Sequence, residues 1–436
     1  MLFKKTFNPY RTFLNRRCRI KYLSTIMLSP TLSHYRFLPR KGFLDFQSLG
    51  QNKNFIRFLW FGLSLVAALK EILANDINNY KIFKYTFINL THFHSLYALQ
   101  PAYYFDSNHY GPLFSFIIAP FTFLDDYTGC FFWVLFNAFV LYKAIMALPI
   151  GFNQRLCVLL ISAHELMTAS FSVQFNPIMT ALILYTFIMV ERKQDFWACF
   201  FISLGTLVKL YGIVGLVFFF FSKNKKVFII SFVSWFVFLF LLPMILSSSG
   251  FVIQTYQEWV STLIFKNQMN ISTGMMQDVS VMGMIRRISG HYQISNALII
   301  LPALFLYSLP IIIHYPNYTP AFKLSMLSST LMFTVLFSTG SESPTYIIAV
   351  TGMAIWYSLR MRSPKPLEVS LLIFALIITS FSPSFLFPQW LNHHIIQKYS
   401  LKALPVFIIW AKITWDYIRF GFKRFEVKVL ENSLVA

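Results

Sequence analysis

Apolar stretches separated by short polar breaks recur along the chain from about residue 55 onward. Crossing the bilayer core takes roughly 20 residues in a helix, so the shorter stretches predict tilted, broken or re-entrant helices. The pattern predicts an all-α, polytopic membrane protein with about 10–12 transmembrane helices. The apolar stretches are 55–74, 111–124, 129–148, 156–173, 177–190, 196–221, 227–246, 293–313, 322–339, 344–360, 366–381 and 402–418.

Two connections between these stretches are longer than the others. The first, about 75–110, contains Asp76, Asp106 and His109, and it lies on the outer side if the chain begins in the cytoplasm. The second, about 247–292, mixes polar and apolar residues and carries a tryptophan. Amphipathic segments of this kind lie along the membrane interface, so we expect that position for the second connection.

The stretch 196–221 is flanked by basic residues on both sides, Arg192-Lys193 before it and Lys223–Lys226 after it. Cytoplasmic loops carry the excess of Lys and Arg, so a single crossing would place one basic flank on the wrong side. A hairpin of two half-helices that breaks at Lys209–Gly212 resolves the conflict. At 1.5 Å per residue each arm reaches roughly 20 Å. Lys209 is then deep in the protein, where non-helical backbone lines a cavity.

The composition excludes a large soluble enzyme, because 56% of the residues are hydrophobic and only 12% are charged. Soluble domains average about 25% charged residues. The net charge is +21, and residues 1–57 alone carry +11. A basic arm can bind nucleic acid, but before a first transmembrane helix the positive-inside rule explains it better. We therefore expect a cytoplasmic N-terminus, no nucleic-acid partner, and packing roles for the four scattered cysteines.

Lys209 stands in an otherwise apolar stretch. A cation at membrane depth costs at least about 2.5 kcal/mol on insertion scales, so it requires an anionic partner or a wet cavity. One interpretation is a buried ion pair with Glu165, which lies inside another apolar stretch. The other is a phosphate ligand that projects into a cavity. Glu165 itself suits either a charge pair or a substrate contact.

Several further polar residues are candidates for chemistry. Asp76 follows the first apolar stretch, and on a helix Tyr80 would share its face. An aspartate at the outer edge can act as a base toward a hydroxyl, or it can be a solvated helix terminus. Arg286 suits phosphate oxygens through forked hydrogen bonds, or it anchors the topology. Gln174 and Asn176 can bind sugar hydroxyls, although helix capping is their more common use.

Five short motifs occur in a characteristic order: Asp76-x3-Tyr80, Tyr104 through Tyr110-Gly111-Pro112, Gln174-x-Asn176-Pro177, Gly205-x3-Lys209-Leu210-Tyr211 and Ser280-x2-Gly283-x2-Arg286. In this order they resemble the membrane-embedded GT-C enzymes that use polyprenyl-phosphate sugars, and among them glycosyltransferase family 87, whose known activities are mannosyl transfers. The resemblance covers about residues 55–360, and the tract 191–223 looks like family members from Bacteroidetes-type bacteria.

The resemblance implies a GT-C-type bundle with a long first outer loop. Its parts are a basic cytoplasmic segment (1–54), a transmembrane catalytic domain (55–360) and C-terminal helices with a basic tail (361–436). It implies an inverting transfer of a hexose from a polyprenyl-phosphate sugar to a glycolipid or glycan acceptor. The hexose would be mannose, as in the known activities of the family. The active site would face the periplasm from the cytoplasmic membrane. The sequence has no clustered acidic motif such as DxD, so we expect neither a metal nor a cofactor.

Carried over residue by residue, the resemblance makes Asp76 the candidate catalytic base. It makes Lys209 and Arg286 candidate ligands of the donor phosphate. Many family members carry Ser-Pro followed by Trp-His in a late outer loop, but the matching stretch 340–346 has no histidine. Either Glu342 takes part of that catalytic role, or the donor and acceptor differ from the mannosyl case. The other candidate substrate-binding residues are Tyr80, Tyr110, Gln174, Asn176 and Glu165.

Two other classes of protein share many of these features. A lipid-linked glycan polymerase or ligase would show nearly all of them. A transporter or flippase of a lipid-linked sugar would show paired broken helices in its two halves, whereas this sequence has one strong break, at Lys209. The long polar loop after the first apolar stretch also favours an enzyme.

Overall fold

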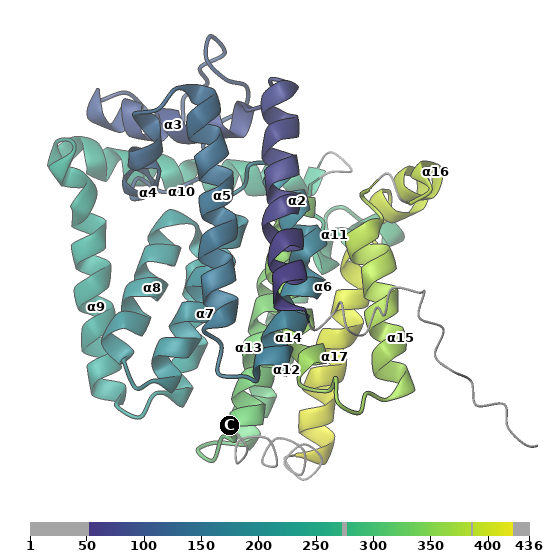
Figure 1. Ribbon diagram of the computed structural model, residues 1–436. Helices are drawn as coiled ribbons and strands as arrows, with labels where there is room; N and C mark the ends of the chain where they lie inside the picture. Colours follow the sequence, from purple (N-terminus) through teal and green to yellow (C-terminus); the bar gives the residue numbers. More distant parts are fainter. Residues whose placement is uncertain (1–51, 273–276, 385–386, 422–436) are drawn as a thin grey trace, which may run out of the picture. The chain divides into compact units, whose positions relative to one another are not determined.

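The computed structural model describes residues 52–272, 277–384 and 387–421, and these residues form helices and loops without a strand (Figure 1). The all-α prediction is therefore confirmed. The expected N-terminal segment lies outside the described residues up to residue 51, and so does the basic tail from residue 422.

The helices follow the apolar stretches closely along the chain. In the first half they are α2 (Lys53–Leu73), α3 (Asn78–Thr91), α4 (Phe114–Thr122), α5 (Asp126–Met146), α6 (Phe152–Phe171), α7 (Asn176–Glu191), α8 (Asp195–Val208) and the 3₁₀ helix η1 (Leu210–Phe221). In the second half they are α9 (Lys225–Leu241), η2 (Leu242–Ile245), α10 (Ser249–Ser272), α11 (Val281–Ser289), α12 (Asn296–Ile313), α13 (Pro320–Leu336), η3 (Ser343–Thr345), α14 (Tyr346–Ser358), α15 (Pro366–Ala375), η4 (Leu376–Phe381), α16 (Gln389–Leu391), η5 (Asn392–Gln397) and α17 (Ala403–Phe420).

Lipid-facing surfaces are visible on the outer helices. Within the described residues, α5, α9 with η2, and α12 are long and apolar enough to cross a membrane, and several shorter apolar helices accompany them. Large apolar side chains stay exposed on α9 and α12: Ile230 is 66% exposed, Leu301 63% and Phe305 62%. Contiguous apolar surface of this extent is unfavourable in water but suits lipid. The structure is that of a polytopic membrane protein.

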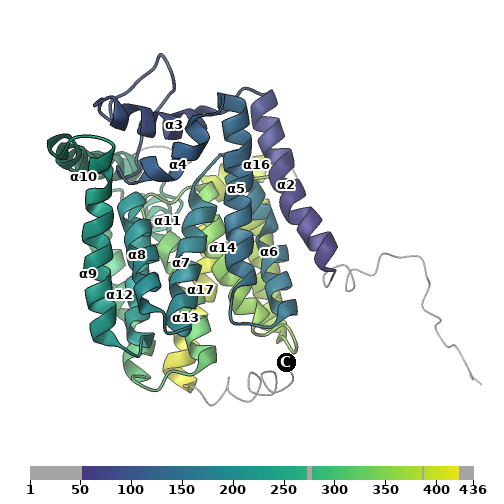
Figure 2. The ribbon, with the colours of Figure 1, turned by 60° about the vertical axis from the view of Figure 1, so that its left-hand side comes forward.

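Two helices lie across one end of the bundle (Figures 1 and 2). The helices α5, α7, α8, α9 and α13 run along the bundle, while α3 and α10 lie across the same end of it. The helix α10 comes from the connection 247–292, for which we expected a position along the interface. It does not run beside α9 as another span would.

The link between α2 and α3 differs from the prediction. Asn75 adopts a left-handed conformation (φ 55°), and the Asp76 N–H donates to the Glu71 carbonyl oxygen at 2.9 Å. This hydrogen bond closes the end of α2 in the manner that Asn and Gly favour. Asp76 therefore lies exposed in the link, whereas Tyr80 is buried in α3. The two residues do not share a helix face, because the helix ends between them.

The predicted hairpin is confirmed at the predicted residue. The helix α8 ends at Val208, Lys209 is extended (φ −151°, ψ 112°), and η1 returns alongside α8. A Cβ on Gly212 would lie 2.3 Å from the carbonyl carbon of Gly205. Only glycine allows this close approach of the two arms. The Gly111 N–H donates to the Val208 carbonyl oxygen at 2.9 Å, so the first outer loop caps the broken end.

The bundle core is formed by α13 and α14, which are buried over most of their length. The Ser328 hydroxyl donates to the Gly352 carbonyl oxygen at 2.6 Å, and a Cβ on Gly352 would lie 2.7 Å from the Ser328 carbonyl oxygen. Small residues allow membrane helices to approach in this way. The C-terminal helix α17 packs on α13, and the Tyr417 hydroxyl donates to the Ser325 hydroxyl at 2.9 Å.

Candidate active site

A cavity of about 660 Å³ lies where the first outer loop, the hairpin break, α10 and the α13–α14 loop meet. We call it the main cavity. Its charged and polar lining includes Asp106, His109, Tyr110, Gln174, Lys209, Lys266, Asn267, Asn270 and Glu342. Its apolar lining includes Ile213, Val214, Leu263, Ile300, Phe333 and Phe337. Pockets with a mostly apolar wall and a few convergent polar groups are the usual form of ligand sites.

Lys209 is held in place by neutral groups. Its Nζ donates to Asn176 Oδ1 at 2.7 Å, and it lies 4.9 Å from the ring centroid of Tyr211 and 5.5 Å from that of Tyr110. The Tyr110 hydroxyl in turn donates to Gln174 Oε1 at 3.3 Å. Cation–π contacts and one amide orient the ammonium group without cancelling its charge.

Lys266 is the second cation of the main cavity. It lies on α10 one to two turns after Trp259 and Leu263, so these residues share one helix face toward the cavity. Among the ion pairs of the described residues, none involves Lys209 or Lys266. A sheltered cation without a bonded carboxylate is costly, so the cavity favours an anionic ligand.

Glu342 is one of the two carboxylates that line the main cavity, the other being Asp106. Glu342 lies in the loop between α13 and α14, at the start of η3. Burial raises the pKa of the Glu342 carboxyl above its usual range, while Lys209 and Lys266 act in the opposite direction. A carboxylate with a raised pKa is a stronger base than an exposed one.

His109 lines the same cavity with both ring nitrogens buried and without a hydrogen-bond partner among the described residues. Burial, together with the positive charge of Lys266, lowers the pKa of His109 to about 4. The imidazole is therefore neutral near pH 7. It can accept one hydrogen bond from a bound ligand and donate another.

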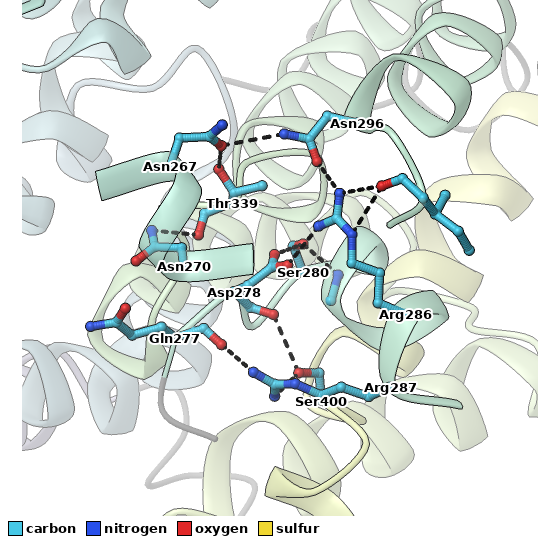
Figure 3. Close-up of polar contacts among 12 residues, drawn as sticks. Asn267, Asn270, Gln277, Asp278, Ser280, Arg286, Arg287, Asn296, Thr339 and Ser400 are labelled. Atoms are coloured by element: carbon cyan, nitrogen blue, oxygen red, sulfur yellow. Dashed lines mark hydrogen bonds and ion pairs between the residues drawn. The ribbon is translucent and has the colours of Figure 1, made fainter. Parts of the chain in front are cut away.

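Arg286 has a structural position behind the main cavity (Figure 3). Its guanidinium pairs with Asp278 at 3.0 Å, donates to the Ile294 carbonyl oxygen, and contacts the side-chain oxygen of Asn296. The Asn296 amide then reaches the cavity residue Asn267 at 3.3 Å. Arg286 is 1% exposed and does not line the cavity. Its guanidinium already has buried oxygens as partners, and its role as a ligand of the donor phosphate stays a prediction.

Glu165 pairs with a lysine that the sequence did not suggest. Lys402 Nζ lies 3.2 and 3.3 Å from the two carboxylate oxygens of Glu165 and 2.8 Å from the Ser343 hydroxyl. Both partners are buried, with side-chain exposures of 0% for Glu165 and 5% for Lys402. The interpretation of Glu165 as the partner of Lys209 is therefore wrong, whereas its interpretation as one half of a charge pair holds.

The structure brings together about half of the predicted site residues. Tyr110, Gln174, Lys209 and Glu342 line the main cavity, and Asn176 contacts Lys209. Asp76, Tyr80, Arg286 and Glu165 do not line it. The Tyr80 hydroxyl donates to the Phe121 carbonyl oxygen at 2.9 Å, and its ring packs against Gly129. The prediction missed the cavity residues Asp106, His109, Lys266, Asn267 and Asn270.

A signal for the missed α10 residues was present in the sequence. Trp259, Leu263, Lys266, Asn267 and Asn270 recur at helical spacing, so they form one face of an amphipathic helix. Polar residues on the face that also carries Trp and Leu indicate a polar cavity beneath that face. The prediction that the connection 247–292 lies along the membrane interface does not distinguish the helix face that lines the cavity from the opposite face.

Comparison with known families identifies the class of protein. The family model of glycosyltransferase family 87 matches residues 108–339, just over half of the chain. The chain therefore belongs to glycosyltransferase family 87, and it is a membrane-embedded glycosyltransferase. A search of curated proteins finds no match. The matched range contains Lys209, Lys266 and most of the main cavity, but it ends before Glu342.

Proposed function

We propose that this glycosyltransferase moves a hexose, with mannose as the first candidate, from a polyprenyl-phosphate sugar to a glycolipid or glycan acceptor. The observation that carries the proposal is the charge arrangement of the main cavity. None of the ion pairs within the described residues involves Lys209 or Lys266, and Glu342 lines the same cavity. Two such ammonium groups suit the phosphate of a donor, and the apolar wall suits the lipid attached to it.

The proposed reaction is an inverting displacement. The acceptor hydroxyl gives its proton to the Glu342 carboxylate while its oxygen attacks the anomeric carbon. The bond between that carbon and the phosphate oxygen breaks, and the lipid phosphate leaves with the electron pair. Lys209 and Lys266 stabilise the negative charge that collects on the leaving phosphate. The low dielectric of a sheltered cavity strengthens this interaction.

Glu342 is the base that we propose, although both Asp76 and Glu342 were predicted as catalytic. Glu342 lines the cavity that holds the two lysines, and its raised pKa suits proton transfer. Asp76 lies exposed in the link between α2 and α3. Asp76 is not among the residues that line the main cavity, although Asn79, three residues further along the chain, is.

We also propose that the main cavity opens on the outer side of the cytoplasmic membrane. The α8–η1 hairpin has Arg192 and Lys193 at one foot and Lys223, Lys225 and Lys226 at the other, so both feet lie at the same end. Positively charged loops stay in the cytoplasm. The tip of the hairpin, with Lys209 at the cavity, is then on the opposite side.

A transfer assay tests the donor class. The purified full chain in nanodiscs receives short-chain polyprenyl-phosphate mannose, glucose or galactose carrying labelled sugar, together with a membrane glycolipid extract. Matching reactions use the corresponding nucleotide sugars, and the Glu342→Gln variant is the control. We expect label to enter the extract from a polyprenyl-phosphate sugar with the wild-type protein alone. Transfer from nucleotide sugars only would refute the proposed donor.

A further inference from the structure

A second cavity, of about 370 Å³, shares Glu342 with the main cavity. The walls of the second cavity come from Thr168 on α6, from Ser172 directly after that helix, from Ser343 beside Glu342, and from the C-terminal segment. Among the C-terminal lining residues are Ser382, Asn392, Gln397 and Lys402.

The lysine that lines the second cavity, Lys402, is already paired with a carboxylate. The ammonium group of Lys402 is bonded to both carboxylate oxygens of Glu165 and to the Ser343 hydroxyl. Its charge is therefore already compensated, unlike that of Lys209 in the main cavity. An anionic ligand would gain little here, because it would have to compete with a buried carboxylate for the same cation.

The remaining lining groups suit a sugar. The cavity presents hydroxyls from Thr168, Ser172 and Ser382 and amides from Asn392 and Gln397. The hydroxyls of Thr168 and Ser382 donate to the carbonyl oxygens of His164 and Ile378, so they offer acceptor oxygens to a ligand. The side-chain amides supply donors, and a ring of sugar hydroxyls requires both kinds of group. Proline and isoleucine side chains lie between them and can cover the apolar faces of a pyranose.

Arg287 holds residues of this cavity's lining in place. Its guanidinium donates to the Gln277 carbonyl oxygen at 2.5 Å and contacts the Ser400 hydroxyl (Figure 3). It also donates to the Gln397 carbonyl oxygen at 3.1 Å. Gln277, Gln397 and Ser400 all line the second cavity. A wall fixed by such contacts loses little freedom when a ligand binds, which favours affinity.

We propose that the second cavity binds the neutral sugar unit of the acceptor, so that the hydroxyl to be glycosylated reaches Glu342 from this side. The inference rests on the proposed function, in which Glu342 is the base and the main cavity holds the donor. The family match ends at residue 339, before Glu342 and the C-terminal lining residues. The part of the chain that selects the acceptor therefore lies largely outside the matched range.

Ligand binding without turnover tests the inference. Saturation-transfer NMR on the full chain in nanodiscs uses methyl α-mannoside and methyl β-glucoside as neutral probes and methyl phosphate as the anionic probe. Thr168→Phe fills the second cavity, and Lys209→Met removes the cation of the main cavity. Leu160→Phe adds the same ring on an exposed position of α6 and is the control for bulk.

We expect the glycoside signal to be lost in Thr168→Phe and kept in Lys209→Met and Leu160→Phe. The methyl phosphate signal should show the reverse, lost in Lys209→Met and kept in Thr168→Phe. The near-isosteric Thr168→Val removes only the hydroxyl and should weaken glycoside binding by about tenfold. This variant tests the same site if Thr168→Phe does not fold.

A glycoside signal that persists in both Thr168 variants, disappears only in Lys209→Met, or is absent from the wild type would overturn the inference. The proposed function is tested by a different measurement, the transfer assay. If transfer from polyprenyl-phosphate sugars is absent, the donor assignment is wrong, and the glycoside signals still show whether the second cavity takes a neutral sugar.

Discussion

The two cavities of this protein share Glu342, but their lysines differ in the groups that contact the ammonium nitrogen. In the main cavity Lys209 contacts an amide and two aromatic rings, which leave its charge available. In the second cavity Lys402 is bonded to the buried carboxylate of Glu165. Within the described residues, the same residue type thus has no ion pair in one place and is half of a buried ion pair in the other. The partner, more than the lysine itself, decides which ligand each cavity can take.

The largest expected effect is on the residue that both cavities share. Glu342→Gln should reduce the transfer rate by about 10³-fold, because it removes the base but keeps the shape. Donor binding, measured with labelled polyprenyl-phosphate sugar, should persist, since Lys209 and Lys266 remain.

Asp76→Asn is the matched variant for this experiment. It changes the other carboxylate that the sequence suggested, and the structure places it on an exposed turn. We expect Asp76→Asn to keep most of its transfer activity. Loss of transfer in Asp76→Asn with normal transfer in Glu342→Gln would move the base to Asp76.

The second effect concerns stability at the second cavity. Glu165→Gln should lower the free energy of unfolding by about 3 kcal/mol, because Lys402 is left buried without its counter-charge. Replacing both residues with Met removes both charges and should recover most of the loss. Thermal unfolding in detergent micelles measures these changes.

The pair of Lys323 and Glu191 is the control for Glu165→Gln. Its nitrogen–oxygen distance is 2.8 Å, but both side chains are about one-fifth exposed. Glu191→Gln should therefore cost less than about 1 kcal/mol. Equal losses in Glu165→Gln and Glu191→Gln would show that the Glu165–Lys402 pair does not behave as a buried one.

The third effect concerns Lys209 in the main cavity. Lys209→Met should lower kcat/KM for the donor by about 10²-fold, since one stabilising group of the leaving phosphate is lost. The acceptor KM should stay unchanged, because the second cavity is intact. Steady-state kinetics with each substrate varied in turn gives both values. A rise in the acceptor KM alone would mean that the two cavities have been assigned the wrong ligands.

The smallest effect is a shift in pH dependence. Transfer requires an ionised Glu342, so activity falls as the pH decreases through the pKa of this carboxyl, which burial raises. Lys266 acts to lower that pKa, and Lys266→Met should therefore move the acidic limb of kcat/KM to higher pH, by up to about one unit.

His109→Asn is the control for the pH shift. Burial holds the pKa of His109 at about 4, so the ring is already neutral over most of the working range. The acidic limb should stay in place in this variant. If the acidic limb of kcat/KM shifts in His109→Asn but not in Lys266→Met, the group that titrates is the imidazole of His109.

The sequence by itself was sufficient for the fold class and for the hairpin. Apolar stretches of bilayer length predict helices because backbone polar groups in lipid have to be satisfied internally. Basic residues on both flanks of 196–221 predict a return of the chain, because loops of that charge stay on one side. Both inferences use only residues close together along the chain, and the structure agrees with an extended break at Lys209.

Only the tertiary structure decided which charged residues face a ligand. Lys402 and Glu165 are far apart in the sequence, and a buried ion pair between them leaves no local pattern. Arg286 lies only eight residues after its partner Asp278, but the sequence does not show that Asp278 and the Ile294 carbonyl oxygen take up its charge. Asp76 and Tyr80 were separated because a left-handed Asn75 ends the helix between them. Charge compensation depends on packing in three dimensions, so it distinguishes a substrate lysine from a structural one only once the helices are assembled.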